Sequence, residues 1–213
     1  MFRDRRDAGR YLAELLISYK GGDVVVIGIP RGGVIVAHEV ARALGAPLDL
    51  VVPRKIGAPG NPELALGAIA PGGIQVLDKN LITHLAVSDE YLEMTIENEI
   101  KEIERRTAVY REGLGPLVVK GKTAIVVDDG VATGATTEAA LEFVKKLQPA
   151  HLVLAVPVGP PDTLQRLKNK ADDIVVAHAP SIFYAVGQFY ERFDQTTDSE
   201  VITVMQVYRQ PDV

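Results

Sequence analysis

Short apolar runs, rich in β-branched residues, recur along the chain and are separated by segments with helical spacing of apolar positions. Runs without polar alternation are typical of strands buried on both faces of a parallel sheet. They predict strands at residues 24–29, 48–52, 124–127, 152–156 and 174–177. Because strands that alternate with helices form parallel sheets through right-handed crossovers, we expect an α/β fold that binds ligands beyond the carboxyl ends of its strands.

The intervening segments predict helices. Apolar residues at helical spacing predict an amphipathic helix over residues 7–19, which ends at Gly21 and Gly22. A longer helix should begin at Ser88, a hydroxyl residue followed by two acids, and run to about residue 110. The same spacing predicts helices that end at residue 45, at about residue 147 and at about residue 170.

The segment between the second strand and the long helix follows no single periodicity. Residues 56–63 are rich in glycine and proline and predict a loop. Residues 64–78 predict a β-hairpin, because two apolar arms flank the sequence Ala-Pro-Gly-Gly. We therefore expect a hairpin and a long helix inserted at about residues 64–112 of a single domain that spans residues 1–213.

Composition narrows the class of protein. With 213 residues and 47% hydrophobic content, the chain can form one α/β domain with a full core. It has no cysteine, which excludes disulfides and thiolate sites, and no apolar run long enough to span a bilayer. We therefore expect a cytoplasmic protein without membrane contact. The formal net charge of −5 argues against nucleic-acid binding, which needs a basic face.

The residues after the strand at 124–127 carry the clearest chemistry. Asp128 and Asp129 end this strand, and a loop of small residues and threonines leads into a helix. Because small residues let backbone N–H groups approach an anion at a helix N-terminus, the loop predicts a phosphate site. Its candidate residues are Ala132, Thr133, Gly134, Ala135, Thr136 and Thr137. The two carboxylates suit sugar hydroxyls or a metal ion, so a phosphorylated sugar meets both demands.

A second candidate anion site lies at the turn after the first predicted strand, which reads Gly-Ile-Pro-Arg-Gly-Gly. Gly32 and Gly33 can turn backbone N–H groups toward an anion, and Arg31 adds a delocalised charge with several donors. The glycine spacing does not match the dinucleotide-binding fingerprint. Two further cations, Arg54 and Lys55, follow the second strand and could reach the same anion.

Together these motifs resemble the type I phosphoribosyltransferases, which use phosphoribosyl diphosphate (PRPP). The apolar strand, acidic pair and Thr-Gly-Ala-Thr loop are similar to the family's PRPP motif, except that Gly130 stands where an aliphatic residue is usual. The Arg-Gly-Gly turn is similar to the family's diphosphate loop. The resemblance implies a Rossmann-like parallel sheet flanked by helices, a small hood formed near the termini, a Mg²⁺ cofactor, and PRPP with a small-molecule acceptor as ligands. It is also compatible with a homodimer.

The resemblance implies a role for each motif. Asp128 and Asp129 would hold the ribose hydroxyls, directly or through Mg²⁺, and residues 132–137 would hold the 5-phosphate. A mobile loop over residues 57–62 would close to exclude water. The diphosphate would bind to Arg31, Gly32, Gly33, Arg54 and Lys55, and the catalytic residues would be Asp128, Asp129, Arg31 and Lys55.

The family's hood places an aromatic residue over the acceptor base. The similar segment here reads Phe-Tyr-Ala-Val-Gly and follows a Pro-Ser turn. Tyr184 fits the stacking position best, and Phe183 and Val186 would complete the acceptor site. Ordinary packing of an aromatic pair is the alternative interpretation of this segment.

Two positions bear on the acceptor. Members of the family that use 6-oxopurines have an aspartate where this chain has Ala132, and a lysine where it has Pro157. Both departures count against hypoxanthine, guanine and xanthine, so the acceptor stays open as a nucleobase or another nitrogen compound.

Two other classes of function stay open. A regulatory module could keep the fold and bind PRPP or a nucleotide without catalysis, although the intact acidic pair and Arg31 favour an enzyme. A different α/β enzyme, such as a phosphatase acting on a phosphosugar, lacks an evident nucleophile, because there is no cysteine and the aspartates precede a Thr-Gly-x-Thr loop.

Overall fold

A computed structural model describes residues 1–209 and confirms the predicted α/β architecture. Five parallel strands form the main sheet in the order β2-β1-β6-β7-β8. Their bounds are Leu48–Leu50, Val24–Gly28, Thr123–Val127, His151–Val158 and Asp173–His178, in the same order. The second predicted strand is therefore shorter than the range 48–52.

Both faces of this sheet are buried, as the unbroken apolar runs predict. Successive residues of a strand point to opposite faces. Val26 and Ile125 accordingly belong to one hydrophobic cluster, whereas Ile27, Val126 and Leu154 belong to another. All five side chains are fully buried.

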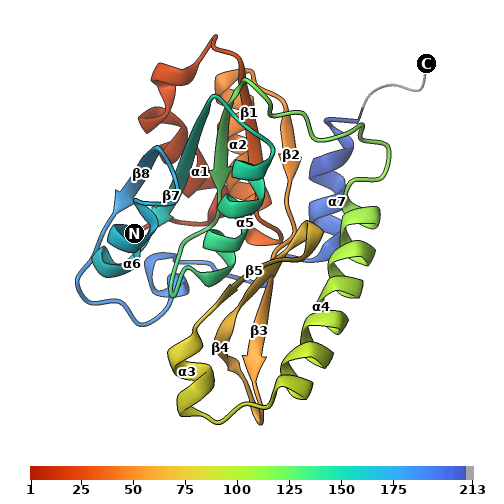
Figure 1. Cartoon of the computed structure of the whole chain (residues 1–213). Coiled ribbons are helices and arrows are strands. Elements are labelled where there is room, and N and C mark those ends of the chain that lie inside the picture. The colour runs from red at the N-terminus through yellow and green to blue at the C-terminus, as the bar shows by residue number, and fades with distance from the viewer. Residues whose placement is uncertain (210–213) are drawn as a thin grey trace.

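Helices cover the two faces (Figure 1). The first cluster includes side chains of α1 (Arg5–Leu15), α2 (Gly32–Leu44) and α7 (Asp198–Gln206), and the second includes side chains of α5 (Ala135–Lys146) and α6 (Pro161–Leu167). The single helix predicted over residues 7–19 is wrong in its last part. The α-helix ends at Leu15, and Ile17–Tyr19 form a separate 3₁₀ turn, η1.

A second, antiparallel sheet lies below the first in Figure 1 and consists of β3 (Arg54–Ala58), β4 (Asn61–Ala70) and β5 (Ile74–Leu77). The predicted hairpin is confirmed as β4 and β5, with the 3₁₀ turn η2 (Pro71–Gly73) between them. A short helix, α3 (Lys79–His84), follows.

The prediction of a loop over residues 56–63 is wrong, because these residues pair as β3 and β4. The pairing shifts register on both sides of Gly57, as in a β-bulge. A Cβ at this position would lie 2.7 Å from the Cα of Pro62, so glycine permits a close approach of the two strands. Glycine and proline therefore mark an irregular strand pair here. The additional sheet begins at Arg54, ahead of the predicted insert.

The predicted long helix is confirmed as α4 (Asp89–Tyr110), which Ser88 caps through a hydrogen bond accepted from the N–H of Tyr91. It runs along the second sheet and on beside α7 (Figure 1). Tyr91 donates a hydrogen bond to the carbonyl of Gly57, and Arg54 forms an ion pair with Glu99. No helix within residues 1–209 combines the length and apolarity that crossing a membrane requires.

Candidate active site

A cleft of about 480 Å³ opens beyond the carboxyl ends of β1 and β6. Segments far apart in the sequence meet there, among them the start of α1, the Arg-Gly-Gly turn, the acidic pair, and the stretch from Val186 to Thr196. The lining residues are Arg5, Ile29, Pro30, Arg31, Gly32, Pro53, Asp128, Asp129, Thr136, Val186, Phe193, Gln195 and Thr196.

The acidic pair forms the floor of this cleft. The backbone N–H of Asp129 donates to Oδ1 of Asp128 at 2.8 Å, and the Tyr190 hydroxyl donates to the carbonyl of Asp129 at 2.6 Å. Burial raises the pKa of Asp128 well above the usual value, and the charge of Asp129 raises it further. Burial also raises the pKa of Asp129, although the nearby Arg5 opposes this shift. The site therefore disfavours ionisation of both carboxyl groups, and a bound cation or a partner with hydroxyl donors would offset this cost.

The Arg-Gly-Gly turn packs directly against this pair. A Cβ at Gly32 would overlap Oδ2 of Asp129 and lie 2.5 Å from Nε of Arg5, and a Cβ at Gly33 would lie 2.8 Å from the Cα of Asp128. The peptide bond from Pro30 to Arg31 is cis. Glycine at these two positions thus allows two turns of the main sheet to touch. The sequence pattern did not predict this packing role.

Arg5 is a residue of this site that the sequence analysis missed. Its Nε donates to Oδ2 of Asp129 at 2.6 Å, and Nη1 donates to the carbonyl of Asp194 at 2.7 Å. The guanidinium lies 3.9 Å above the ring centre of Phe193, and only 13% of the side chain is exposed. Nothing in the sequence distinguishes Arg5 from its neighbours Arg3 and Arg6, because its partners lie more than 120 positions away.

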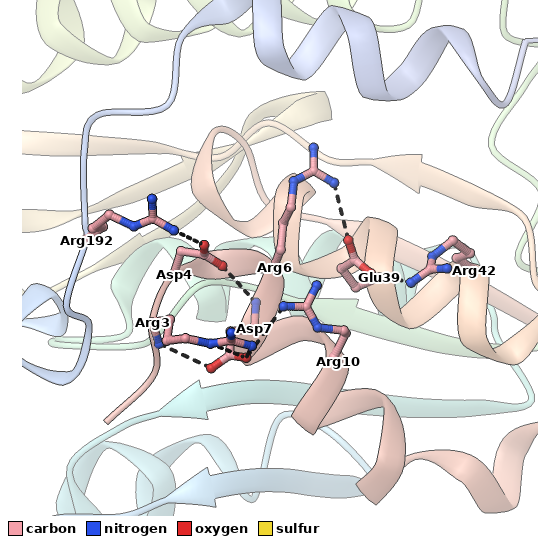
Figure 2. Close-up of polar contacts among 8 residues, drawn as sticks. All are labelled: Arg3, Asp4, Arg6, Asp7, Arg10, Glu39, Arg42 and Arg192. Atoms are coloured by element: carbon pink, nitrogen blue, oxygen red, sulfur yellow. Dashed lines mark hydrogen bonds and ion pairs between the residues drawn. The ribbon is translucent and has the colours of Figure 1, made fainter.

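Ion pairs fix the helix that carries Arg5, as Figure 2 shows. Asp4 caps α1 by accepting from the N–H of Asp7, and it also pairs with Arg192. Asp7 forms ion pairs with both Arg3 and Arg10. The buried Glu39 of α2 forms ion pairs with both Arg6 and Arg42. The start of α1 is therefore held against both α2 and the segment that brings Phe193 to the cleft.

The predicted phosphate loop leads into α5. Gly134 is the N-cap residue with φ 75°, a conformation that glycine adopts without strain, and no side chain caps the helix. Thr136 faces the cleft, Thr137 is buried, and Ala132 and Thr133 are exposed. Thr133 and Ala135 line a neighbouring groove, and Arg166 donates to the carbonyl of Thr133. The first turn of α5 thus has N–H groups without side-chain caps at the edge of the cleft, as anion binding requires.

The sequence profile of the phosphoribosyl transferase domain family matches residues 4–193. The chain belongs to this family. Two Mycobacterium tuberculosis proteins, from strains CDC 1551/Oshkosh and H37Rv, are each 43% identical to it over 205 residues, and their names propose a phosphoribosyl transferase. The matched region is 96% of this chain and 46% of each relative, so the chain spans about half the length of these proteins.

Two solved structures are similar to this phosphoribosyl transferase domain. The crystal structure of TT1426 from Thermus thermophilus has a TM-score of 0.81 and 44% identity, and the match covers 99% of this chain and 100% of that one. The AQ2163 protein from Aquifex aeolicus has a TM-score of 0.50 and 14% identity over 82% of this chain and 74% of that one, which shows the fold alone. The predicted family is therefore confirmed.

The cations predicted for the diphosphate of this phosphoribosyl transferase domain lie in different places. Arg31 lines the cleft, and its Nη1 lies 3.3 Å from Oδ1 of Asp198. Arg54 and Lys55 are not among the lining residues. Arg54 pairs with Glu99 of α4, and Lys55 pairs with Glu63 across the β3–β4 hairpin at 3.0 Å. The structure brings one of the three cations to the acidic pair.

Of the three predicted acceptor residues, one lines the cleft and two do not. Val186 lines the cleft, and its Cγ1 occupies the space beside Gly130, where a Cβ would lie 2.5 Å away. Tyr184 is 88% exposed, and Phe183 packs on Phe189 with ring centres 5.3 Å apart. Neither lines the cleft. Gly130, the departure from the usual motif, thus makes room for Val186 of the 3₁₀ turn η3 (Val186–Phe189).

Three aromatic or polar residues that the sequence analysis did not single out form part of the cleft wall. Phe193, Gln195 and Thr196 line the cleft. Thr196 is buried, and none of the hydrogen bonds found within residues 1–209 involves its hydroxyl or the amide of Gln195. This wall therefore combines Phe193, whose ring packs against Arg5 and Tyr190, with two polar groups that a ligand can engage.

The carboxylates of Asp128 and Asp129 fit a Mg²⁺ ion that brings its other ligands. Both supply the hard oxygen donors that Mg²⁺ prefers, and Mg²⁺ commonly binds through one or two carboxylates together with substrate phosphates. No group of three or more histidine, aspartate or glutamate side chains within residues 1–209 forms a complete metal cage. A cation at this site would accordingly be shared between the acidic pair and a phosphorylated substrate.

Proposed function

We propose that this domain is a Mg²⁺-dependent phosphoribosyltransferase that joins a nitrogen acceptor to C1 of the ribose of PRPP and releases diphosphate. The observation that carries the proposal is the contact between the Arg-Gly-Gly turn and the half-buried acidic pair, in one cleft with the uncapped start of α5. Phosphate, sugar and diphosphate groups each find complementary chemistry within this cleft.

Each part of PRPP has a proposed partner. The 5-phosphate binds N–H groups and hydroxyls of residues 132–137, where the dipole of α5 favours negative charge. Asp128 and Asp129 bind the ribose hydroxyls. The diphosphate binds Arg31 with backbone groups of Gly32 and Gly33. Lys55 and Arg54 join it only if the β3–β4 hairpin moves toward the cleft.

The reaction places positive charge on the ribose ring. The bond from C1 to the diphosphate oxygen breaks and its electron pair leaves with diphosphate, while the acceptor nitrogen forms a bond to C1 and loses its proton to solvent. The two carboxylates stabilise the developing charge, and Arg31 stabilises the leaving group. Mg²⁺, when bound, would supply further charge neutralisation on the diphosphate. Arg5 must exchange its bond to Asp129 for another partner if the ribose uses that oxygen.

The acceptor side is the wall of Val186, Phe193, Gln195 and Thr196. Amide and hydroxyl groups beside apolar side chains suit a planar nitrogen heterocycle or an amide. Ala132 and Pro157 still count against 6-oxopurines. Stacking by Tyr184 stays a prediction that requires the exposed loop to fold over the cleft.

A regulatory module that binds PRPP without turnover is the second candidate. The ion pair between Arg5 and Asp129 favours it, because a permanent partner on Asp129 would leave only one free carboxylate for ribose or metal.

Titration of PRPP with and without Mg²⁺, followed by exchange of labelled diphosphate over a panel of bases and amines, tests the proposal. We expect Mg²⁺-dependent binding and exchange with at least one acceptor. The double variant Asp128→Asn with Asp129→Asn should lose turnover and keep its fold. Absence of PRPP binding by the wild-type protein, or normal turnover by the double variant, would contradict the proposal. Binding without exchange would favour the regulatory module.

A further inference from the structure

Two linked hydrogen bonds connect the cleft residue Arg31 to Asp198 and Asp198 to Tyr110. Its Nη1 lies 3.3 Å from Oδ1 of Asp198, the first residue of α7. The hydroxyl of Tyr110, the last residue of α4, donates to the same oxygen at 2.7 Å. Neither Asp198 nor Tyr110 lines the cleft. Asp198 contacts Arg31 directly, and Tyr110 contacts Asp198.

Tyr110, at the far end of these hydrogen bonds, is fixed by its burial. The residue is only 1% exposed. Burial, followed by the hydrogen bond to Asp198, raises the pKa of Tyr110 to about 12, so its hydroxyl keeps its proton and acts as a donor. In turn, the hydroxyl of Tyr110 lowers the pKa of Asp198. A charged carboxylate also suits the N-terminus of α7.

The contact leaves Arg31 able to bind an anion. A guanidinium carries five N–H donors, and one of them is directed to Asp198. The Arg31 side chain is 28% exposed, so without a partner it would have solvent and several rotamers available. Immobilising a long side chain when a ligand binds costs conformational entropy, and a contact already made in the free protein reduces that cost.

We infer that Asp198 and Tyr110 are positioning residues that hold the guanidinium of Arg31 ready for the diphosphate of the substrate. This inference rests on the proposed function. It also assigns a role to α4: Tyr110 lies at its end, and near its start the hydroxyl of Tyr91 donates to the carbonyl of Gly57 in β3. Electrostatic attraction alone would predict the opposite effect, because a carboxylate partly neutralises Arg31 and so weakens its attraction for an anion.

The experiment measures the KM for PRPP, kcat, and the Kd for inorganic diphosphate with Mg²⁺. We expect Asp198→Ala to raise KM and Kd about fivefold to tenfold, which matches the cost of ordering one long side chain, with kcat changed little. Asp198→Asn keeps an oxygen acceptor and should retain most of the affinity. Tyr110→Phe should raise KM and Kd less than Asp198→Ala does.

A double-variant cycle separates positioning from a general structural role. In an Arg31→Ala background, Asp198→Ala should have no further effect on the Kd for diphosphate, because its target is gone. Asp23→Asn is the matched control, since it breaks an exposed ion pair with Lys122 instead.

Four results would overturn the inference: unchanged or tighter diphosphate binding in Asp198→Ala, an equal loss in the Arg31→Ala background, an equal loss in Asp23→Asn, or no binding of diphosphate by the wild-type protein. If the wild-type protein binds PRPP and catalyses exchange while Asp198→Ala behaves normally, the proposed function stands and the positioning role fails.

Discussion

Two regions of the molecule carry residues with proposed roles, yet they are built differently. One is the junction where the Arg-Gly-Gly turn meets the acidic pair, and the other is the hairpin of β3 and β4. At the junction, glycines allow backbone and carboxylates to touch, and Arg5 and Tyr190 fix the position of Asp129. In the hairpin, Lys55 pairs with Glu63, whose side chain is 90% exposed.

This difference separates groups that are preorganised from groups that must move. Residues at the ends of the main sheet's strands inherit the rigidity of a core buried on both faces. Lys55 lies on a small sheet outside the cleft, and its exposed ion pair is of the kind that contributes little stability. We expect substitutions at the junction to change both stability and turnover, and substitutions in the hairpin to change turnover alone.

The largest expected effect on stability follows from Gly32→Ala. Its methyl group would overlap the Asp129 carboxylate, and overpacking of this kind costs about 1–3 kcal/mol. Because the carboxylate must shift, turnover should also fall roughly 100-fold. Thermal unfolding and diphosphate exchange measure the two effects. Gly115→Ala is the control, because no atom lies within 4 Å of its Cβ and its φ is not in the left-handed region. Equal behaviour of the two variants would show that the junction tolerates extra volume.

A smaller effect of opposite sign is expected for Asp128→Asn. The raised pKa of Asp128 means that the folded chain binds more protons than the unfolded chain between the usual aspartate pKa and the raised one. Wild-type stability therefore falls as pH rises through this window. Asparagine does not titrate and keeps Oδ1 for the N–H of Asp129.

The Asp128→Asn variant should accordingly melt above the wild type at pH 7, by about 2–4 °C for each 1 kcal/mol gained. The difference should vanish near pH 4, while turnover is lost at all pH values. Thermal melts at several pH values check this. A variant that melts below the wild type at pH 7 would show that the acidic pair stabilises the fold and carries no electrostatic cost.

The smallest expected effect on stability is that of Lys55→Ala, which should change the free energy of unfolding by less than about 0.5 kcal/mol, as for most exposed positions. Turnover should fall about tenfold if Lys55 reaches the diphosphate during the reaction, since a charged hydrogen bond is lost. Lys122→Ala, which removes an ion pair with Asp23, is the matched control. Equal turnover of Lys55→Ala and wild type would restrict the diphosphate site to the junction.

Local sequence signals predicted the main sheet, because apolar β-branched runs such as those of β1 and β6 are sufficient to specify buried parallel strands. These signals predicted a loop at residues 56–63, where glycine and proline instead belong to a pair of strands with a bulge. The acidic pair and the Arg-Gly-Gly turn were recognisable because each is a short, continuous motif at the end of a strand.

The other half of the cleft could not be predicted from local signals. Arg5, Phe193 and Thr196 have no motif of their own, and only tertiary folding brings them to Asp129. Tyr184 illustrates the converse, because a plausible aromatic in a suitable segment lies outside the cleft and in solvent. Residues contributed by distant segments require the structure.

The contact from Arg5 to the carbonyl of Asp194 joins residues 189 positions apart. Phe2 likewise forms a bridge to Tyr190. A chain leaving the ribosome therefore completes the main sheet before its cleft, because β8 ends at His178 and the segment that meets α1 has yet to emerge. The acidic pair and the phosphate loop can fold early, whereas the wall opposite them closes only after residues 186–196 have been synthesised.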